Sequence, residues 1–140
     1  MRSGAARRPG RPRPGSAAGI DDPVRLGVAL YNAGRFWEAH EALESVWRGA
    51  AGAERPVWQG LIQAAAAMLH RERGNAHGLR VQGRAAVEKL AGPRPDGFPV
   101  ETVRFVQALV ACVEAGGPVP PMEMAEPPDG RRAPGWSGET

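Results

Sequence analysis

Residues 35–50 read RFWEAHEALESVWRGA, and this stretch decides the fold class. Its apolar residues recur at the spacing of a helix, about 100° per residue. They form one arc of a helical wheel, made of Phe36, Ala39, Leu43, Val46 and Trp47. His40 lies inside the same arc. The stretch therefore predicts an amphipathic helix that buries a histidine among apolar side chains.

The sequence on either side has the same periodicity, interrupted by glycine and proline. We predict five helices, over residues 23–33, 35–50, 55–73, 76–91 and 100–116. No stretch alternates cleanly enough to predict a strand. Connections this short usually join antiparallel neighbours. The sequence thus predicts an all-α fold, a compact bundle of about five antiparallel helices or two and a half helical hairpins like those of a repeat protein.

Glycine and proline are concentrated at the two ends of the chain. Residues 1–19 contain five arginines and no acidic residue, and residues 117–140 contain six prolines without a periodic apolar pattern. Neither end has enough large apolar side chains to offset the entropy lost on ordering. We therefore predict one helical domain over residues 20–116, between a disordered Arg/Pro/Gly-rich tail and a disordered Pro-rich tail.

The cysteine content and the hydropathy pattern indicate a compartment. Cys112 is the single cysteine and falls in an apolar helical pattern, so no disulfide framework and no paired-cysteine metal motif is expected. No stretch resembles a secretory signal or a membrane-spanning helix. We predict a cytoplasmic protein with no membrane contact.

Three motifs stand out in the central part of the chain: YNAGRFWEAHEALESVW at residues 31–47, WQGLIQ at residues 58–63 and HRERGNAHG at residues 70–78. Together they resemble a bacterial and archaeal family known as domain of unknown function 309. The resemblance spans roughly residues 24–116 and departs from the family pattern at Leu79, where a small residue is usual. It implies a compact all-helical fold similar to tetratricopeptide-like hairpins and no established activity.

His40 and Glu44 are four residues apart, so two side chains on one helical face can reach the same ion or proton. His70, with Gln63 beside it, could complete a divalent-metal or acid–base centre, with Glu41 in reserve. The alternative is a polar network in which His40 donates to Glu44 or Gln63 and joins two helices. The sequence favours the network, and no cofactor is predicted for it.

Other polar residues have two interpretations each. Gln59 and Gln63 could bind a small polar ligand in a groove lined by tryptophans, or could simply pair with the neighbouring helix. Asn75 could help to bind an anion at a helix start, or could only cap that helix. Glu38 is expected on the outer side of its helix. The tryptophans of the proposed groove are Trp37, Trp47 and Trp58.

These observations leave three classes of function open. The first is a helical binding or scaffolding module, working as a homo-oligomer or with a protein partner, with a polar cluster of His, Glu and Gln between the second and third helices. The second is a metal-assisted hydrolase that uses His40, Glu44 and His70. The third is a nucleic-acid accessory protein acting through the basic N-terminal tail. We favour the first class.

Overall fold

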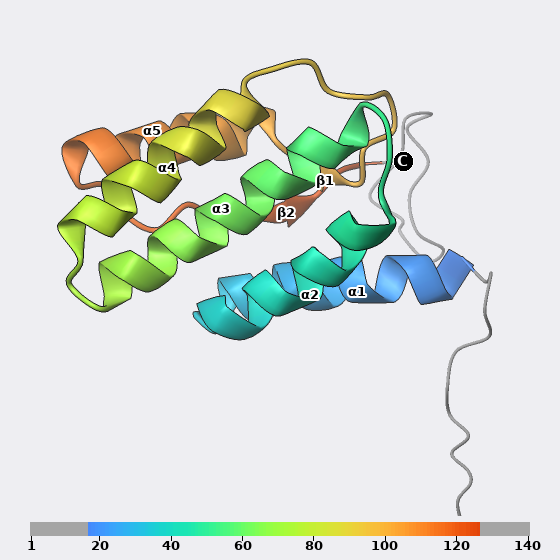
Figure 1. Ribbon diagram of the computed structural model, residues 1–140, viewed down its shortest axis with the longest axis horizontal. Helices are drawn as coiled ribbons and strands as arrows, with labels where there is room; N and C mark the ends of the chain where they lie inside the picture. Colours follow the sequence, from blue (N-terminus) through green and yellow to red (C-terminus); the bar gives the residue numbers. More distant parts are fainter. Residues whose placement is uncertain (1–16, 127–140) are drawn as a thin grey trace, which may run out of the picture.

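The computed structural model describes residues 17–126 and confirms the predicted all-α class. Five helices pack together, and two strands of two residues each form a small sheet (Figure 1). The elements in chain order are α1 Ala17–Asn32, α2 Phe36–Gly49, α3 Glu54–Glu72, α4 Ala76–Leu90, β1 Val100–Glu101, α5 Val103–Ala115 and β2 Glu123–Met124.

Each helix packs against the next one along the chain, which gives the arrangement of hairpins expected from the short connections. The helix α3 is the most buried: its buried residues include Trp58, Leu61 and Met68 together with small residues. Glycines let neighbouring helices approach closely. A Cβ added at Gly60 would lie 2.8 Å from the side chain of Leu90, and one at Gly83 would lie 2.5 Å from that of Val113. The small buried residues of α3 thus allow close packing at the centre of the bundle.

The start of α1 corrects the sequence prediction. We expected Asp22 to cap a helix that begins at Pro23, but the backbone is helical from Ala17 and Pro23 lies inside α1. Proline removes one backbone donor and is disfavoured within a helix, which is why the sequence suggested a helix start there. The predicted tail of residues 1–19 overlaps this helix by three residues, and residues 1–16 lie outside the described part of the chain.

The two strands also correct the sequence prediction. The strand β1 pairs antiparallel with β2, with Val100 opposite Met124 and Glu101 opposite Glu123. The helix α5 consequently begins at Val103 rather than at residue 100. Strands of two residues are too short to produce a recognisable alternation, so periodicity could not reveal them.

The chain after α5 is part of the fold. Residues 117–125, called the strap below, run from the end of α5 back to β1 behind the helices in Figure 1, and they contact α1 on the way. Pro120 is buried and Met122 is 1% exposed, so residues beyond position 116, where we predicted the domain to end, also pack against the helices. The rest of the predicted C-terminal tail, residues 127–140, lies outside the described residues.

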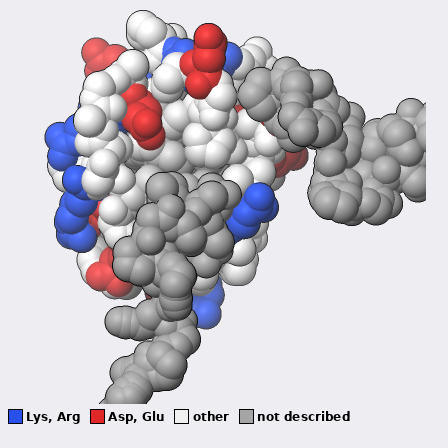
Figure 2. Space-filling view, turned by 90° about the vertical axis from the view of Figure 1, so that its right-hand side faces the viewer, with Lys and Arg blue, Asp and Glu red and all other residues white. Residues whose placement is uncertain are grey.

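The face of the domain that Figure 2 shows carries charges of both signs. Acidic and basic side chains both occur on its described part. The nucleic-acid hypothesis depended on the N-terminal arginines, and residues 1–16 lie outside the described range. Within residues 17–126, no helix is both long and apolar enough to cross a membrane.

Candidate functional site

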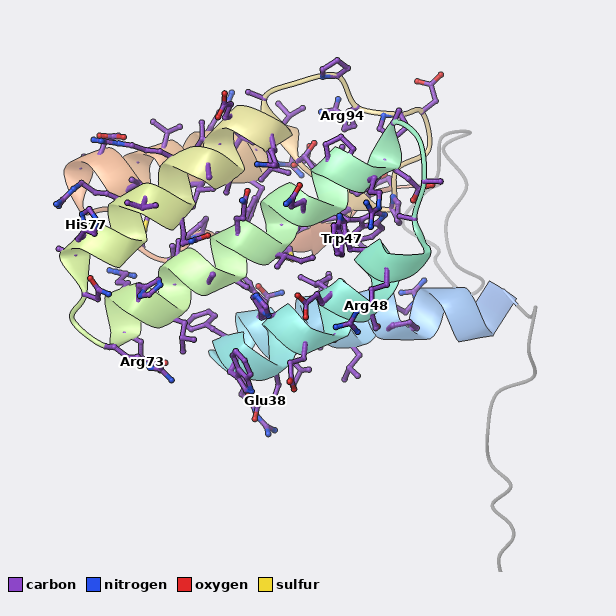
Figure 3. All side chains as sticks on the ribbon, viewed as in Figure 1. Glu38, Trp47, Arg48, Arg73, His77 and Arg94 are labelled. Carbon is purple, nitrogen blue, oxygen red and sulfur yellow. The ribbon has the colours of Figure 1, made fainter. Side chains whose placement is uncertain are left out.

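The outer side of α2 carries the first acidic residue of the predicted cluster. Glu38 accepts a hydrogen bond from Arg35 at 2.8 Å and lies on the side of α2 away from α3 (Figure 3). This hydrogen bond holds the pKa of the Glu38 carboxyl below its usual value. Glu41 is exposed as well. These two acids are therefore solvated.

His40 is partly buried, but it bonds neither Glu44 nor Gln63, the two partners that the predicted network offered. Its ring stacks on Trp37 with centroids 5.5 Å apart and planes 7° apart, and Trp37 is 52% exposed. Glu44 instead pairs with Arg48 at 3.3 Å, one turn along α2. The buried Nδ1 atom of His40 has no hydrogen-bond partner among the described residues.

Gln63 of α3 and Trp47 of α2 each have a buried polar atom without a partner. The Oε1 atom of Gln63 accepts no hydrogen bond within residues 17–126, and the Nε1 atom of Trp47 donates none. Gln59 is only partly buried. The buried atoms of His40 and Gln63, two members of the predicted network, therefore do not pair with one another.

The three tryptophans occupy different environments. Trp37 is exposed, whereas the ring of Trp47 is covered by the guanidinium of Arg55 at 4.0 Å. Trp58 is 2% exposed, donates to Glu54 at 2.8 Å and packs on Phe98. Figure 3 places Trp47 and Glu38 at opposite ends of α2. A shared groove lined by all three rings is not formed.

His70 belongs to a separate unit at the turn between α3 and α4. Asn75 caps α4 by accepting from the backbone N–H of Gly78 at 2.9 Å, and its side-chain nitrogen lies 3.0 Å from Nδ1 of His70. The predicted capping role of Asn75 is confirmed. Because its carboxamide already bonds the amide of Gly78, that amide is not free for an anion.

The proposed metal ligands do not come together. Glu44 pairs with Arg48 and His70 with Asn75, while His40 stacks on Trp37. Within residues 17–126, no group of three or more His, Cys, Asp and Glu side chains is placed to hold a metal ion. The donor set of the hydrolase hypothesis is therefore not assembled in this arrangement.

The most specific polar contacts involve two residues that sequence reasoning did not select. Tyr31 donates to the carbonyl of Pro120 at 2.7 Å. Asn32 makes a pair of bonds with the backbone of Met122: its amide nitrogen donates to the carbonyl at 2.7 Å, and its oxygen accepts from the N–H at 2.9 Å. We call these three hydrogen bonds the clasp. The signal that could have found it is the polar Asn32 directly after the apolar face of α1.

Further contacts hold the other end of the strap. The N–H of Ala125 donates to the carbonyl of Pro99 at 2.8 Å, next to the pairing of β1 with β2. Arg104 of α5 bonds Glu123 at 3.2 Å. The strap thus lies extended between the end of α1 on one side and β1 on the other, and main-chain atoms make most of its hydrogen bonds.

Comparison with known proteins supports the family resemblance. Residues 24–81 match the family described as domain of unknown function (DUF309), which confirms the resemblance over those residues. The match runs from α1 into α4 and includes the clasp residues Tyr31 and Asn32, whereas α5 and the strap lie outside it. No curated protein matches the chain.

Proposed function

We propose that this protein is a cytoplasmic helical binding module that recognises an extended polypeptide segment. The site is the surface that the strap occupies, between the end of α1 and β1. The observation that carries the proposal is the pair of hydrogen bonds from the Asn32 carboxamide to the N–H and the carbonyl of Met122. A carboxamide used in this way acts as the edge of a strand would, because it offers one donor and one acceptor to an extended backbone.

The contacts suit recognition of a main chain. The hydrogen bonds of Tyr31 and Asn32 with the strap involve only its backbone atoms. Two residues of β1 pair with two residues of the strap in addition. Addition of a strand to an exposed edge is a common way to bind a peptide, since main-chain bonds supply affinity and side-chain pockets supply specificity. Stacked helical hairpins also present extended binding faces. The strap is then the resident occupant of this surface.

The compartment and the class of function rest on simpler observations. Cys112 is the single cysteine of the chain and is buried as a free thiol, which is compatible with the reducing cytoplasm that we propose. Binding is favoured over metal-assisted hydrolysis because the clasp forms a complete set of hydrogen bonds, whereas His40, Glu44 and His70 each pair elsewhere.

The test uses the full chain with its own strap weakened. Met122→Asp places a charge at a buried position, and Met122→Ala is the milder variant for use if aspartate prevents folding, as judged by circular dichroism. A fluorescein-labelled peptide with the sequence of residues 117–126, GPVPPMEMAE, is titrated into the folded variant and followed by anisotropy. We expect saturable binding that is much weaker in the wild type, where the tethered strap competes at an effective concentration of about a millimolar.

The matched control combines the strap variant with Asn32→Leu, which removes both hydrogen bonds at nearly constant size. Binding should be lost in this double variant. Hydrogen exchange in the wild type gives a second measurement. The opening that exposes the Met122 amide should require a lower free energy than the opening that exposes the amide of Leu109 in the core. Absence of peptide binding to a folded strap variant, or strap exchange only through global unfolding, would contradict the proposal.

A further inference from the structure

Burial alternates along the strap. The side chains of Pro120 and Met122 are buried and that of Met124 is partly buried, whereas Val119, Pro121 and Glu123 between them are exposed. This period of two is that of an extended chain that lies with one face on a surface. In a peptide bound in place of the strap, every second side chain would therefore pack against the protein.

Resting on the proposed function, we infer that the site selects extended peptides with the pattern proline, any residue, apolar residue, acidic residue, apolar residue. The strap itself supplies this pattern as Pro120, Pro121, Met122, Glu123 and Met124. The partner is thus a segment of another protein that shares this chemistry and displaces the strap.

Proline is accepted at the first position because the only hydrogen bond there is the one that its carbonyl accepts from Tyr31, and no contact requires an N–H. The ring also restricts the chain to an extended conformation, which lowers the entropy lost on binding.

The third position has the opposite requirement. Asn32 accepts a hydrogen bond from the N–H of Met122, so proline is excluded there, and the side chain must be apolar because it is 1% exposed in the strap. An unbranched flexible side chain such as methionine fits irregular apolar surroundings. This position should contribute most to selectivity.

The fourth position faces a charge. Arg104 bonds Glu123 at 3.2 Å and lies 3.7 Å from Glu101, with its side chain 74% exposed. An exposed ion pair contributes modestly and weakens with salt. An acidic residue is therefore preferred at this position without being required.

The experiment titrates a panel of labelled peptides into the folded Met122→Asp or Met122→Ala protein. The parent is GPVPPMEMAE, and the peptide variants are Met122→Pro, Glu123→Lys and Pro121→Ala, with a scrambled peptide of the same composition. We expect the Met122→Pro peptide to bind with at least about tenfold lower affinity than the parent. Proline lacks the N–H that Asn32 accepts, and the buried methionine side chain is lost as well. Glu123→Lys should bind about two- to fivefold more weakly at low salt and equally at 1 M salt.

The matched control is Pro121→Ala, which changes an exposed position and should bind like the parent. Equal binding of the parent, Met122→Pro and scrambled peptides would overturn the inferred pattern and leave the binding function standing. Absence of binding by all peptides to a folded variant would overturn the binding function and the pattern together. Selective loss in the expected order supports both.

Discussion

The imidazole of His70 lies so close to Gly78 that a Cβ added at Gly78 would be 2.5 Å from its Cγ and Nδ1 atoms. The ring of His70 is also bonded to Asn75, which caps α4 through the N–H of Gly78. Moving the ring away from Gly78 would break its hydrogen bond to the residue that caps α4. This explains the histidine, asparagine and glycine of the third motif as a structural unit joining α3 to α4.

The first prediction follows from this contact. Gly78→Ala should lower the free energy of unfolding by about 1–3 kcal/mol, because the added methyl group overpacks a fixed ring. Gly49→Ala is the matched control, since a Cβ at Gly49 meets nothing within 4 Å and alanine is the better helix former. It should be neutral or stabilise by up to about 1 kcal/mol. Urea denaturation of both variants measures the difference, and equal stability would contradict the contact.

A second prediction concerns the unpaired acceptor of Gln63. Gln63→Met replaces a buried oxygen that has no partner among the described residues, so it should be neutral or raise the melting temperature. Asn32→Leu also replaces a carboxamide by an apolar side chain, but this carboxamide donates one hydrogen bond and accepts another. The variant should lower the free energy of unfolding by about 1–3 kcal/mol, because the N–H and the carbonyl of Met122 lose their partners. Differential scanning calorimetry compares the two. A large loss in Gln63→Met would mean that the amide has a partner not found among residues 17–126.

A third prediction separates the network from the metal centre. Adding Zn²⁺ or Mn²⁺ to protein purified without a histidine tag should give no saturable, stoichiometric rise in melting temperature, because His40, Glu44 and His70 are not grouped around one position. A rise that disappears in both His40→Ala and His70→Ala would contradict this arrangement and favour the hydrolase hypothesis.

A fourth prediction concerns the acid titration of Glu114. Arg84 donates two hydrogen bonds of 2.9 Å to the Glu114 carboxylate, and these bonds keep the pKa of that carboxyl below its usual value. The folded pKa is lower than the unfolded one, so the pair stabilises the fold above pH about 4.3 and this contribution is lost as the pH falls through the folded pKa. Carboxyl NMR should show the pKa of Glu114 rising in Arg84→Gln. An unchanged pKa would mean that the pair is not formed in solution.

Helical periodicity was sufficient to predict the fold class and four of the five helix positions within a few residues. The apolar arc from Phe36 to Trp47 predicted α2, and Gly74 and Asn75 marked the turn before α4. Such signals are local, because capping and periodicity depend on residues within a few positions of one another. The start of α1 was missed since Pro23 resembles a first helical residue.

The clasp could not be predicted in the same way. Tyr31 and Asn32 bond residues 89 and 90 positions away, and the partners contribute backbone atoms that no side-chain pattern reveals. The strap was assigned to a disordered tail because the C-terminal residues are rich in proline and have no periodic apolar pattern. The polar cluster was found as residues, but its pairing was wrong for Glu44, because Arg48 on the same helix competes for the carboxylate.

The last prediction uses the fact that Tyr31 is the only tyrosine of the chain. Burial raises the pKa of the Tyr31 phenol well above its usual value, and the phenol must keep its proton to donate to Pro120. Since the folded pKa is higher than the unfolded one, the fold loses stability as the pH rises above about 10, where the phenol of the unfolded chain ionises. The absorbance change of tyrosinate near 295 nm should therefore be absent from the folded protein and appear together with the loss of helical circular dichroism. Met122→Asp, which weakens the strap, should lower the pH at which this change begins. Reversible ionisation near pH 10 in the fully helical wild type would show that Tyr31 is open to solvent, and would contradict both its burial and the clasp.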